Sequence, residues 1–219
     1  MGSLGECGGH GQERGREEGC ACDHSATPLT PAYAQAAKKP KVALVMKSLA
    51  NEFFLTMETG AKDYQKHNAS QFDLITNGIK DETDTANQIR IVEQMIVSKV
   101  DAIVLAPADS KALVPVVKKA IDAGIIVVNI DNRLDPDVLK SKDLNVPFVG
   151  PDNRKGAQKV GDYLAKKLKA GDEVGIIEGV STTTNAQQRT AGFKDAIQTV
   201  GAKVVVQPGN ARCKRRDAR

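Results

Sequence analysis

Polar and aromatic residues suited to binding a hydroxyl-rich molecule recur just after apolar runs in this sequence. They fall into three groups: Asn51 with Phe53 and Phe54; Asp131 with Asn132 and Arg133; and Asn185 with Gln187 and Arg189. Carboxylate and amide groups exchange hydrogen bonds with hydroxyls, an aromatic ring packs against the C–H face of a polyol ring, and a fixed Arg adds donors. These residue types therefore indicate a site for a neutral polyol.

Each of these residues also has a plainer structural explanation. Asn51 is a good helix N-cap, and the two phenylalanines after it could simply pack in a core. Asp131 could begin a turn, and Arg189 could pair with Asp195 on the surface. Taken singly, the local sequence favours these structural roles. Their shared position after apolar runs is what favours a binding site.

Catalytic chemistry finds little support. His67 is the single histidine between residues 38 and 208, it lies in a polar segment that we interpret as a solvated loop, and that range has no cysteine. No G-x-S-x-G, G-x-G-x-x-G or P-loop pattern is present. Cys20, Cys22 and His24 are too few for a zinc site. We therefore predict a protein that is not an enzyme and that has no cofactor and no metal site.

The elements that must position these residues alternate along the chain. Apolar runs predict strands at residues 42–46, 72–76, 100–105, 125–130, 146–150, 173–177 and 203–207. Amphipathic segments predict a helix after residue 52, a helix from 84 or 85 to 99, and a helix that ends at 123. Two further helices are predicted at 153–168 and 186–200. The fold class expected is α/β with doubly wound parallel sheets. A polar loop is expected at residues 47–52. Ligands bind at the carboxyl ends of such strands, so residues 47–54 are the first place to look for function.

The two ends of the chain differ from its body. Residues 1–25 are Gly-rich and charged, and we expect a disordered head at residues 1–37. Ala32-Tyr33-Ala34 fits a signal-peptidase site before Gln35, but no apolar stretch precedes it. We hypothesise a signal peptide disrupted by a frame shift or a mis-assigned start, and the alternative is a chance match in a linker. Residues 209–219 are Arg-rich and look non-native. The net charge of +4 is not gathered on a basic face, which argues against nucleic-acid binding.

Five segments carry a family resemblance. They are VALVMKSLANEFF, VDAIVLAPADSKAL, VVNIDNRLD, VGPDNRKGAQKVGDYLAKKL and NAQQRTAGF, in that order. In them the chain resembles the periplasmic sugar-binding proteins of ABC transporters, of the ribose-binding, LacI-like type I class. The resemblance implies a monomer in the periplasm, with two α/β lobes that close on a monosaccharide and deliver it to an ABC transporter permease.

The resemblance also implies roles for particular residues. Asn51 would bond sugar hydroxyls, Phe53 and Phe54 would stack on the ring, and Asp131 would accept from paired hydroxyls. The remaining expected contacts are Asn132, Arg133, Gln187 and Arg189, and the expected hinge crossing is Asp152 and Asn153. In ribose binders an Arg directly follows the Asp, whereas here Asn132 intervenes. The sugar is therefore expected to be a ribose-like pentose or a hexose, without a choice between them.

The family pattern also sets the expected domains. They are a head at 1–37, a first lobe at 38–150, a partial second lobe at 151–208 and a tail at 209–219. Family members continue past the last expected strand, so we expect a C-terminally truncated chain whose second lobe is incomplete and whose second sheet has an unpaired edge. The alternative function is the sugar-sensing domain of a LacI-type transcription regulator. That reading would need an N-terminal helix-turn-helix, and residues 1–37 show no helical periodicity.

Overall fold

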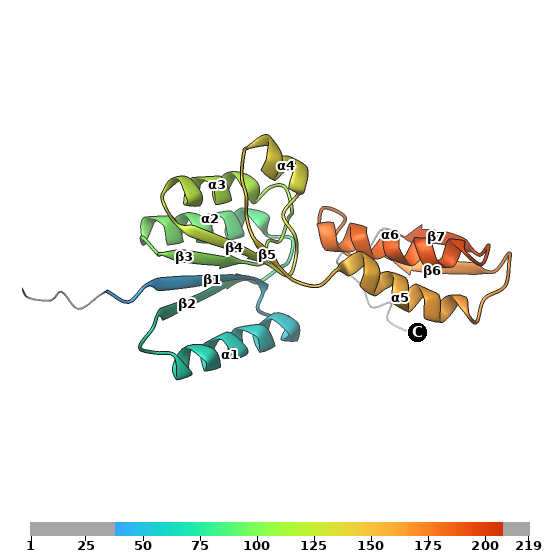
Figure 1. The fold of residues 1–219 in the computed structure, drawn as a ribbon, viewed down its shortest axis with the longest axis horizontal. Helices are drawn as coiled ribbons and strands as arrows, with labels where there is room; N and C mark the ends of the chain where they lie inside the picture. Colours follow the sequence, from blue (N-terminus) through green and yellow to red (C-terminus); the bar gives the residue numbers. More distant parts are fainter. Residues whose placement is uncertain (1–37, 208–219) are drawn as a thin grey trace, which may run out of the picture. The chain divides into compact units, whose positions relative to one another are not determined.

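The computed structural model describes residues 38–207. The expectations of a disordered head, a signal cleavage site and a non-native tail lie outside the described residues. Figure 1 shows strands and helices in alternation. In chain order they are β1 (Lys41–Ser48), α1 (Glu52–His67), β2 (Asp73–Ile79), α2 (Thr85–Val97), β3 (Ala102–Leu105), α3 (Val114–Asp122), β4 (Ile126–Ile130), α4 (Pro136–Ser141), β5 (Phe148–Val149), α5 (Asn153–Ala165), β6 (Glu173–Ile177), α6 (Thr184–Gln198) and β7 (Lys203–Gln207).

The strands form two parallel sheets. The first has five strands in the order β2-β1-β3-β4-β5, and the second pairs β6 with β7. Val42 of β1 pairs with Leu74 of β2 on one side and with Ala102 of β3 on the other, all in parallel register. The predicted α/β class with parallel sheets is confirmed. We call residues 41–149 the first half and residues 153–207 the second half.

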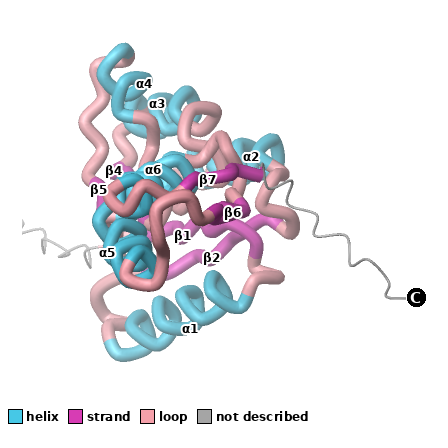
Figure 2. The backbone as a smooth tube through the Cα atoms, turned by 90° about the vertical axis from the view of Figure 1, so that its right-hand side faces the viewer, coloured by secondary structure: helices cyan, strands magenta, loops and turns pink. Residues whose placement is uncertain are grey.

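Helices cover both faces of the first sheet, as Figure 2 shows for α1 on one side of β1 and β2 and for α3 and α4 on the other. Val92 and Met95 of α2 and Val117 of α3 pack against Ile103 and Leu105 of β3 in the larger core. A smaller core on the opposite face joins Phe54 of α1 to Met46 of β1. Because the strands are parallel, every connection from a strand to the next helix leaves at the carboxyl ends of the strands. The polar residues after β1, β3 and β4 therefore gather at that end of the sheet.

The second sheet packs against α5 and α6, which lie alongside each other (Figure 1). Ile197 of α6 is fully buried, and Val174 and Val204 of the strands contact its cluster. Two glycines let the helices approach closely. A Cβ at Gly161 would come within 2.6 Å of the Ala196 Cβ, and a Cβ at Gly192 would overlap the backbone of α5.

One local expectation was wrong, and one helix was missed. The predicted polar loop at residues 47–52 is shorter, because β1 continues through Lys47 and Ser48, which are only 5% and 6% exposed. Helix α4 was not anticipated. It is short, but Asp135 caps it by accepting from the backbone N–H of Asp137 and of Val138, and Pro136 begins it. The pair Asp-Pro after an apolar run is a helix-start signal that could have predicted it.

Within residues 38–207, no helix is both long enough and apolar enough to cross a membrane.

Candidate functional site

A buried charge pair joins the carboxyl ends of β1 and β4. Lys47 Nζ lies 3.5 Å from Asp131 Oδ2, and the two side chains are only 6% and 11% exposed. The ammonium also lies 5.7 Å from the centre of the Phe54 ring. Asp131 follows β4 with a φ of 58°, a left-handed conformation that costs a non-glycine residue about 1 kcal/mol or more.

The Asp131 carboxylate is incompletely satisfied. Its Oδ2 is buried and has no hydrogen-bond partner among the described residues, and the contact with Lys47 is too long to replace one. A buried acceptor without a partner costs about 1–3 kcal/mol. Asp131 and Lys47 together can therefore offer an acceptor and donors to a hydroxyl group that enters beside them.

Asn51 does cap a helix, as the plainer explanation held. Its Oδ1 accepts from the Phe53 N–H at 3.0 Å, and its Nδ2 donates to Glu82 Oε1 at 3.0 Å. The two rings that follow meet edge to face, 5.1 Å apart. Phe53 is 56% exposed, whereas Phe54 is 4% exposed and belongs to the smaller core. Of the two rings, Phe53 has the larger free face.

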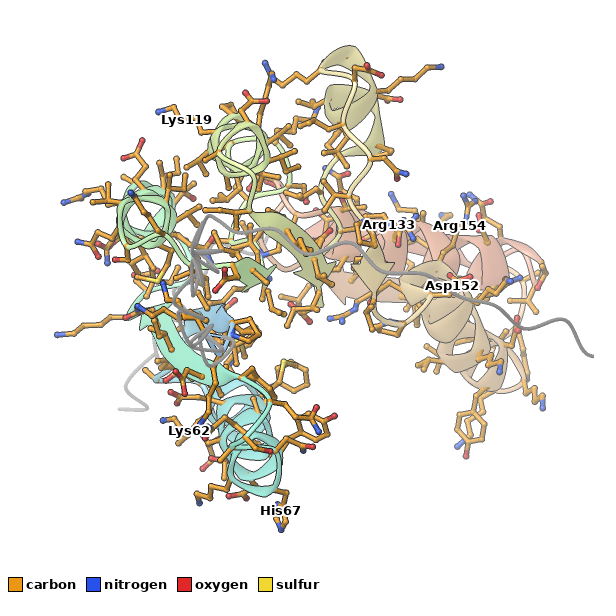
Figure 3. The ribbon with its side chains drawn as sticks, turned by 60° about the vertical axis from the view of Figure 1, so that its left-hand side comes forward. Lys62, His67, Lys119, Arg133, Asp152 and Arg154 are labelled. Atoms are coloured by element: carbon orange, nitrogen blue, oxygen red, sulfur yellow. The ribbon has the colours of Figure 1, made fainter. Side chains whose placement is uncertain are left out.

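The structure does not bring Asn132 and Arg133 to the Asp131 carboxylate. Asn132 is fully buried, and its amide donates to the Pro107 carbonyl at 3.0 Å. The Arg133 guanidinium lies 4.6 Å from the centre of the Phe148 ring and, with that ring, lines a separate cavity of about 530 Å³. Figure 3 labels Arg133 beside the first sheet.

A larger cavity, of about 690 Å³, is lined from both halves. The first half contributes Lys47, Glu82 and Ala108, and Asp152 contributes from the segment between the halves. The polar residues of the second half that line the cavity are Asn153, Glu178, Thr183, Asn185, Arg189 and Thr190. This cavity thus brings Lys47 together with four of the predicted residues, Asp152, Asn153, Asn185 and Arg189. Gln187 is not part of its lining and instead donates to the Ser181 carbonyl at 2.8 Å.

Arg189 is held at the cavity wall by a neighbour from α5. Its Nε donates to Asn153 Oδ1 at 2.7 Å. The expected alternative, a surface pair with Asp195, is wrong, because Asp195 pairs with Arg154 at 2.8 Å. Asp152 caps α5, and the hydrogen bond from the Lys155 N–H lowers the pKa of its carboxyl. Figure 3 shows Asp152 and Arg154 at the start of that helix.

His67 lies away from this site. It belongs to the last turn of α1, not to a loop as we had interpreted, and its Nδ1 lies 2.7 Å from the Asp63 carbonyl oxygen. Figure 3 shows it at the far end of α1. In residues 38–207 no group of three or more His, Cys, Asp or Glu side chains could hold a metal ion.

The sequence reasoning missed two residues of this region. Lys47 was assigned to a loop, although a Lys at the end of an apolar run can also be a buried strand residue. Gln88 gave no local signal at all. It is fully buried in α2, donates to the carbonyls of Met46 at 3.1 Å and Ala106 at 2.9 Å, and accepts from the Ala108 N–H at 2.7 Å. Its amide thereby fixes the ends of β1 and β3.

Comparison with known proteins gives a consistent picture. Residues 42–217 match the family described as periplasmic binding protein domain. A D-ribose/D-allose-binding protein of Pseudomonas aeruginosa is 73% identical over 191 residues, which are 87% of this chain and 60% of that protein. The D-allose-binding periplasmic protein of Escherichia coli is 33% identical over 171 residues, 77% of this chain and 53% of that protein.

Solved structures agree in fold. An ABC transporter solute-binding protein from Burkholderia multivorans superposes with a TM-score of 0.75 and 91% identity, covering 78% of this chain and 60% of that one. A periplasmic solute-binding protein from Actinobacillus succinogenes, with bound D-allose, has a TM-score of 0.69 and 36% identity, covering 77% and 58%. The chain therefore spans about 60% or less of the length of these relatives.

Proposed function

The chain belongs to the periplasmic binding protein family, and on that premise we propose that it is the solute-binding component of a sugar ABC transporter. It binds a monosaccharide reversibly and carries out no catalysis. The whole protein's ligand and partners are part of the proposal, because the chain spans only about 60% of its relatives.

The observation that carries the proposal is the Asp131 carboxylate. Its buried Oδ2 lacks a hydrogen-bond partner within the described residues, and a buried ammonium, that of Lys47, lies beside it. Adjacent hydroxyls of a sugar would donate to the carboxylate, and one of them would accept from Lys47. Hydrogen bonds to charged groups contribute about 1.5–3 kcal/mol each, which suits reversible capture of a small neutral ligand.

The other predicted residues take graded roles in this proposal. Phe53 presents an exposed ring that can pack on the C–H face of a sugar, and Asn51 keeps an amide close to it. Arg189 and Asn153 supply polar groups from the second half, and Asp152 with Asn153 forms the crossing between the halves. The buried Phe54 ring packs edge to face against the Phe53 ring and holds it in place. For Arg133 to contact the sugar, its guanidinium must leave the Phe148 ring. For Gln187 to do so, its amide must leave the Ser181 carbonyl.

The relatives suggest which sugars to try first. One is named for D-ribose and D-allose, another for D-allose, and a solved structure holds D-allose. We therefore propose an aldose of this kind, either a ribose-like pentose or a hexose. The proposed partner is an ABC transporter permease, and the proposed location is the periplasm. The protein is proposed to act as a monomer that does not bind nucleic acid.

Isothermal titration calorimetry tests the proposal. We expect heat on adding D-allose or D-ribose, and a loss of about 2 kcal/mol, roughly thirtyfold in affinity, for Asp131→Asn. The matched control is Asp137→Asn, which changes an exposed carboxylate six residues along the chain and should bind normally. The absence of heat with any pentose or hexose, or equal affinity in Asp131→Asn, would overturn the proposal.

A further inference from the structure

The N-cap residue of helix α6 makes no side-chain hydrogen bond to the first turn. Thr183 occupies its N-cap position, but the Thr183 hydroxyl donates backward to the Val180 carbonyl at 2.7 Å. The first amides of a helix have no partner within the helix, so they need acceptors from elsewhere. The Ala186 N–H donates to Asn185 Oδ1 of the same helix at 2.8 Å, but the acceptors for the Thr184 and Asn185 amides come from the first half, more than fifty residues away in sequence.

Two side chains supply the missing cap. The Thr184 N–H donates to Ser110 Oγ at 2.8 Å, and the Asn185 N–H donates to Asn132 Oδ1 at 3.2 Å. Ser110 is 2% exposed and Asn132 is 0% exposed, so water does not compete for these bonds. We call Ser110 and Asn132 the clasp.

The segment around the clasp adds further bonds between the halves. The Ser110 N–H donates to the Thr182 carbonyl at 3.3 Å, and the Thr182 hydroxyl donates to the Asp109 carboxylate. The loop after β3 therefore holds the residues just before α6 as well as its first turn.

The clasp is also tied to the proposed ligand contact. Asn132 directly follows Asp131, whose backbone is in the left-handed conformation. The Asn132 amide donates to the Pro107 carbonyl at 3.0 Å and to Ser110 Oγ at 3.2 Å, while its own carbonyl accepts from Asn129 Nδ2 at 2.8 Å. With the residue after it fixed in this way, Asp131 cannot change its backbone without disturbing Asn132.

The geometry points to a coupling role: Ser110 and Asn132 are positioning residues that hold α6 against the first half and link its position to sugar binding at Asp131. This inference rests on the proposed function and reassigns Asn132 from a sugar contact to a helix cap. A sugar that fixes Asp131 also fixes Asn132, so the bound state favours the clasped state. By linkage, the clasped state then favours the sugar.

Amide hydrogen exchange without sugar tests the clasp directly. In Ser110→Ala we expect the Thr184 amide to exchange about fivefold faster than in the parent chain, the effect of one ordinary hydrogen bond. The control is Ser141→Ala, which removes a hydroxyl bond within α4, to the Val138 carbonyl, and should leave Thr184 unchanged. Unchanged exchange of the Val45 amide in β1 shows that the variant is folded. An unaltered Thr184 rate in Ser110→Ala would refute the clasp.

Amide hydrogen exchange in the presence of D-allose or D-ribose then tests the coupling between the clasp and sugar binding. We expect sugar to slow exchange at Thr184 and Asn185 in the parent chain, and to slow it less in Ser110→Ala. Because Ser110 touches no ligand in this proposal, its loss should weaken both sugars by the same factor, about fivefold. Bound sugar without slower exchange at these amides, or different factors for the two sugars, would refute the coupling. Failure of every sugar to bind would instead refute the proposed function, while the sugar-free experiment still judges the clasp.

Discussion

The conformation and burial of Asp131 lower the stability of the folded protein. Its left-handed backbone and its buried Oδ2, which has no hydrogen-bond partner among the described residues, both cost free energy, and the contact with Lys47 at 3.5 Å offsets only part of that cost. Such costs persist where the surrounding structure enforces them, often at ligand sites. Asn132 and Gln88, both fully buried and hydrogen-bonded, supply that enforcement at the ends of β3 and β4.

The Lys47–Asp131 pair leads to a first prediction. Lys47→Met leaves the Asp131 carboxylate buried without a counter-charge, so the free energy of unfolding should fall by about 3 kcal/mol at neutral pH. Urea unfolding measures this change. Lys111→Met is the control, because Lys111 lies a similar 3.6 Å from Asp135 but is 67% exposed, and its loss should cost less than about 1 kcal/mol. An equal loss of unfolding free energy in the two variants would mean that burial of the Lys47–Asp131 pair does not contribute to the cost of breaking it.

A second prediction concerns the pH dependence of stability at Asp109. Burial by itself raises the pKa of this carboxyl, but hydrogen bonds from the Ala112 N–H, the Thr182 hydroxyl and the Lys111 N–H outweigh it and lower the pKa. A carboxyl whose folded pKa is below its unfolded value contributes stability above the unfolded pKa, about 4, and loses it as pH falls through the folded pKa.

The variant Asp109→Asn isolates this contribution, because the other carboxyls are common to both proteins. We expect the parent chain to be more stable than Asp109→Asn at pH 7, and the difference to shrink as the pH falls below about 4. Urea unfolding at a series of pH values measures it. A difference that stays constant down to pH 3 would show that Asp109 does not titrate as the structure implies.

Among the elements, α5 and α6 are joined by contacts that only glycine permits. In Gly192→Ala the new methyl group would overlap the backbone carbonyl of Arg154, so the helices must move apart. Overpacking typically costs about 1–3 kcal/mol, and the gain in helix propensity of about 1 kcal/mol offsets part of it. We expect a net loss of roughly 1–2 kcal/mol in the free energy of unfolding, measured by thermal or urea unfolding.

Gly156→Ala provides the matched comparison within α5. A Cβ at Gly156 meets nothing within 4 Å, so only the propensity gain remains, and this variant should be stabilised by up to about 1 kcal/mol. If Gly192→Ala were also stabilising, the close approach of the two helices would not exist in solution.

The elements also show how far the sequence alone could lead. Apolar runs predicted β6 at 173–177 and β7 at 203–207 with their observed bounds, because a short apolar run between turn residues is a local signal. The end of β1 was missed because Lys47 is buried by a partner 84 residues away, which no local pattern contains. Asn132 was expected at the sugar for the same reason: its neighbours, Pro107, Ser110 and Asn185, meet it only in the folded chain.

At the scale of the whole molecule, residues of both halves line the larger cavity. We therefore expect a ligand bound there to stabilise both halves. A ligand that binds the folded form stabilises it by about 2.7 kcal/mol at a concentration one hundred times its dissociation constant. Only the parts that unfold together with the site share in this gain. The bonds of Ser110 and Asn132 to α6 make the second half such a part.

We therefore predict that D-allose or D-ribose, at about one hundred times its dissociation constant, protects core amides in both halves. Hydrogen exchange at Val45 of β1 and at Ile197 of α6 reports on the two cores. Both amides should slow by up to about one hundredfold, and in Asp131→Asn, whose affinity should be about thirtyfold lower, the effect at both should fall to about fourfold at the same sugar concentration. Protection confined to Val45 would mean that the first half binds sugar alone. In that case the second-half residues Asn153 and Arg189 would have no part in binding, however close to the cavity they lie.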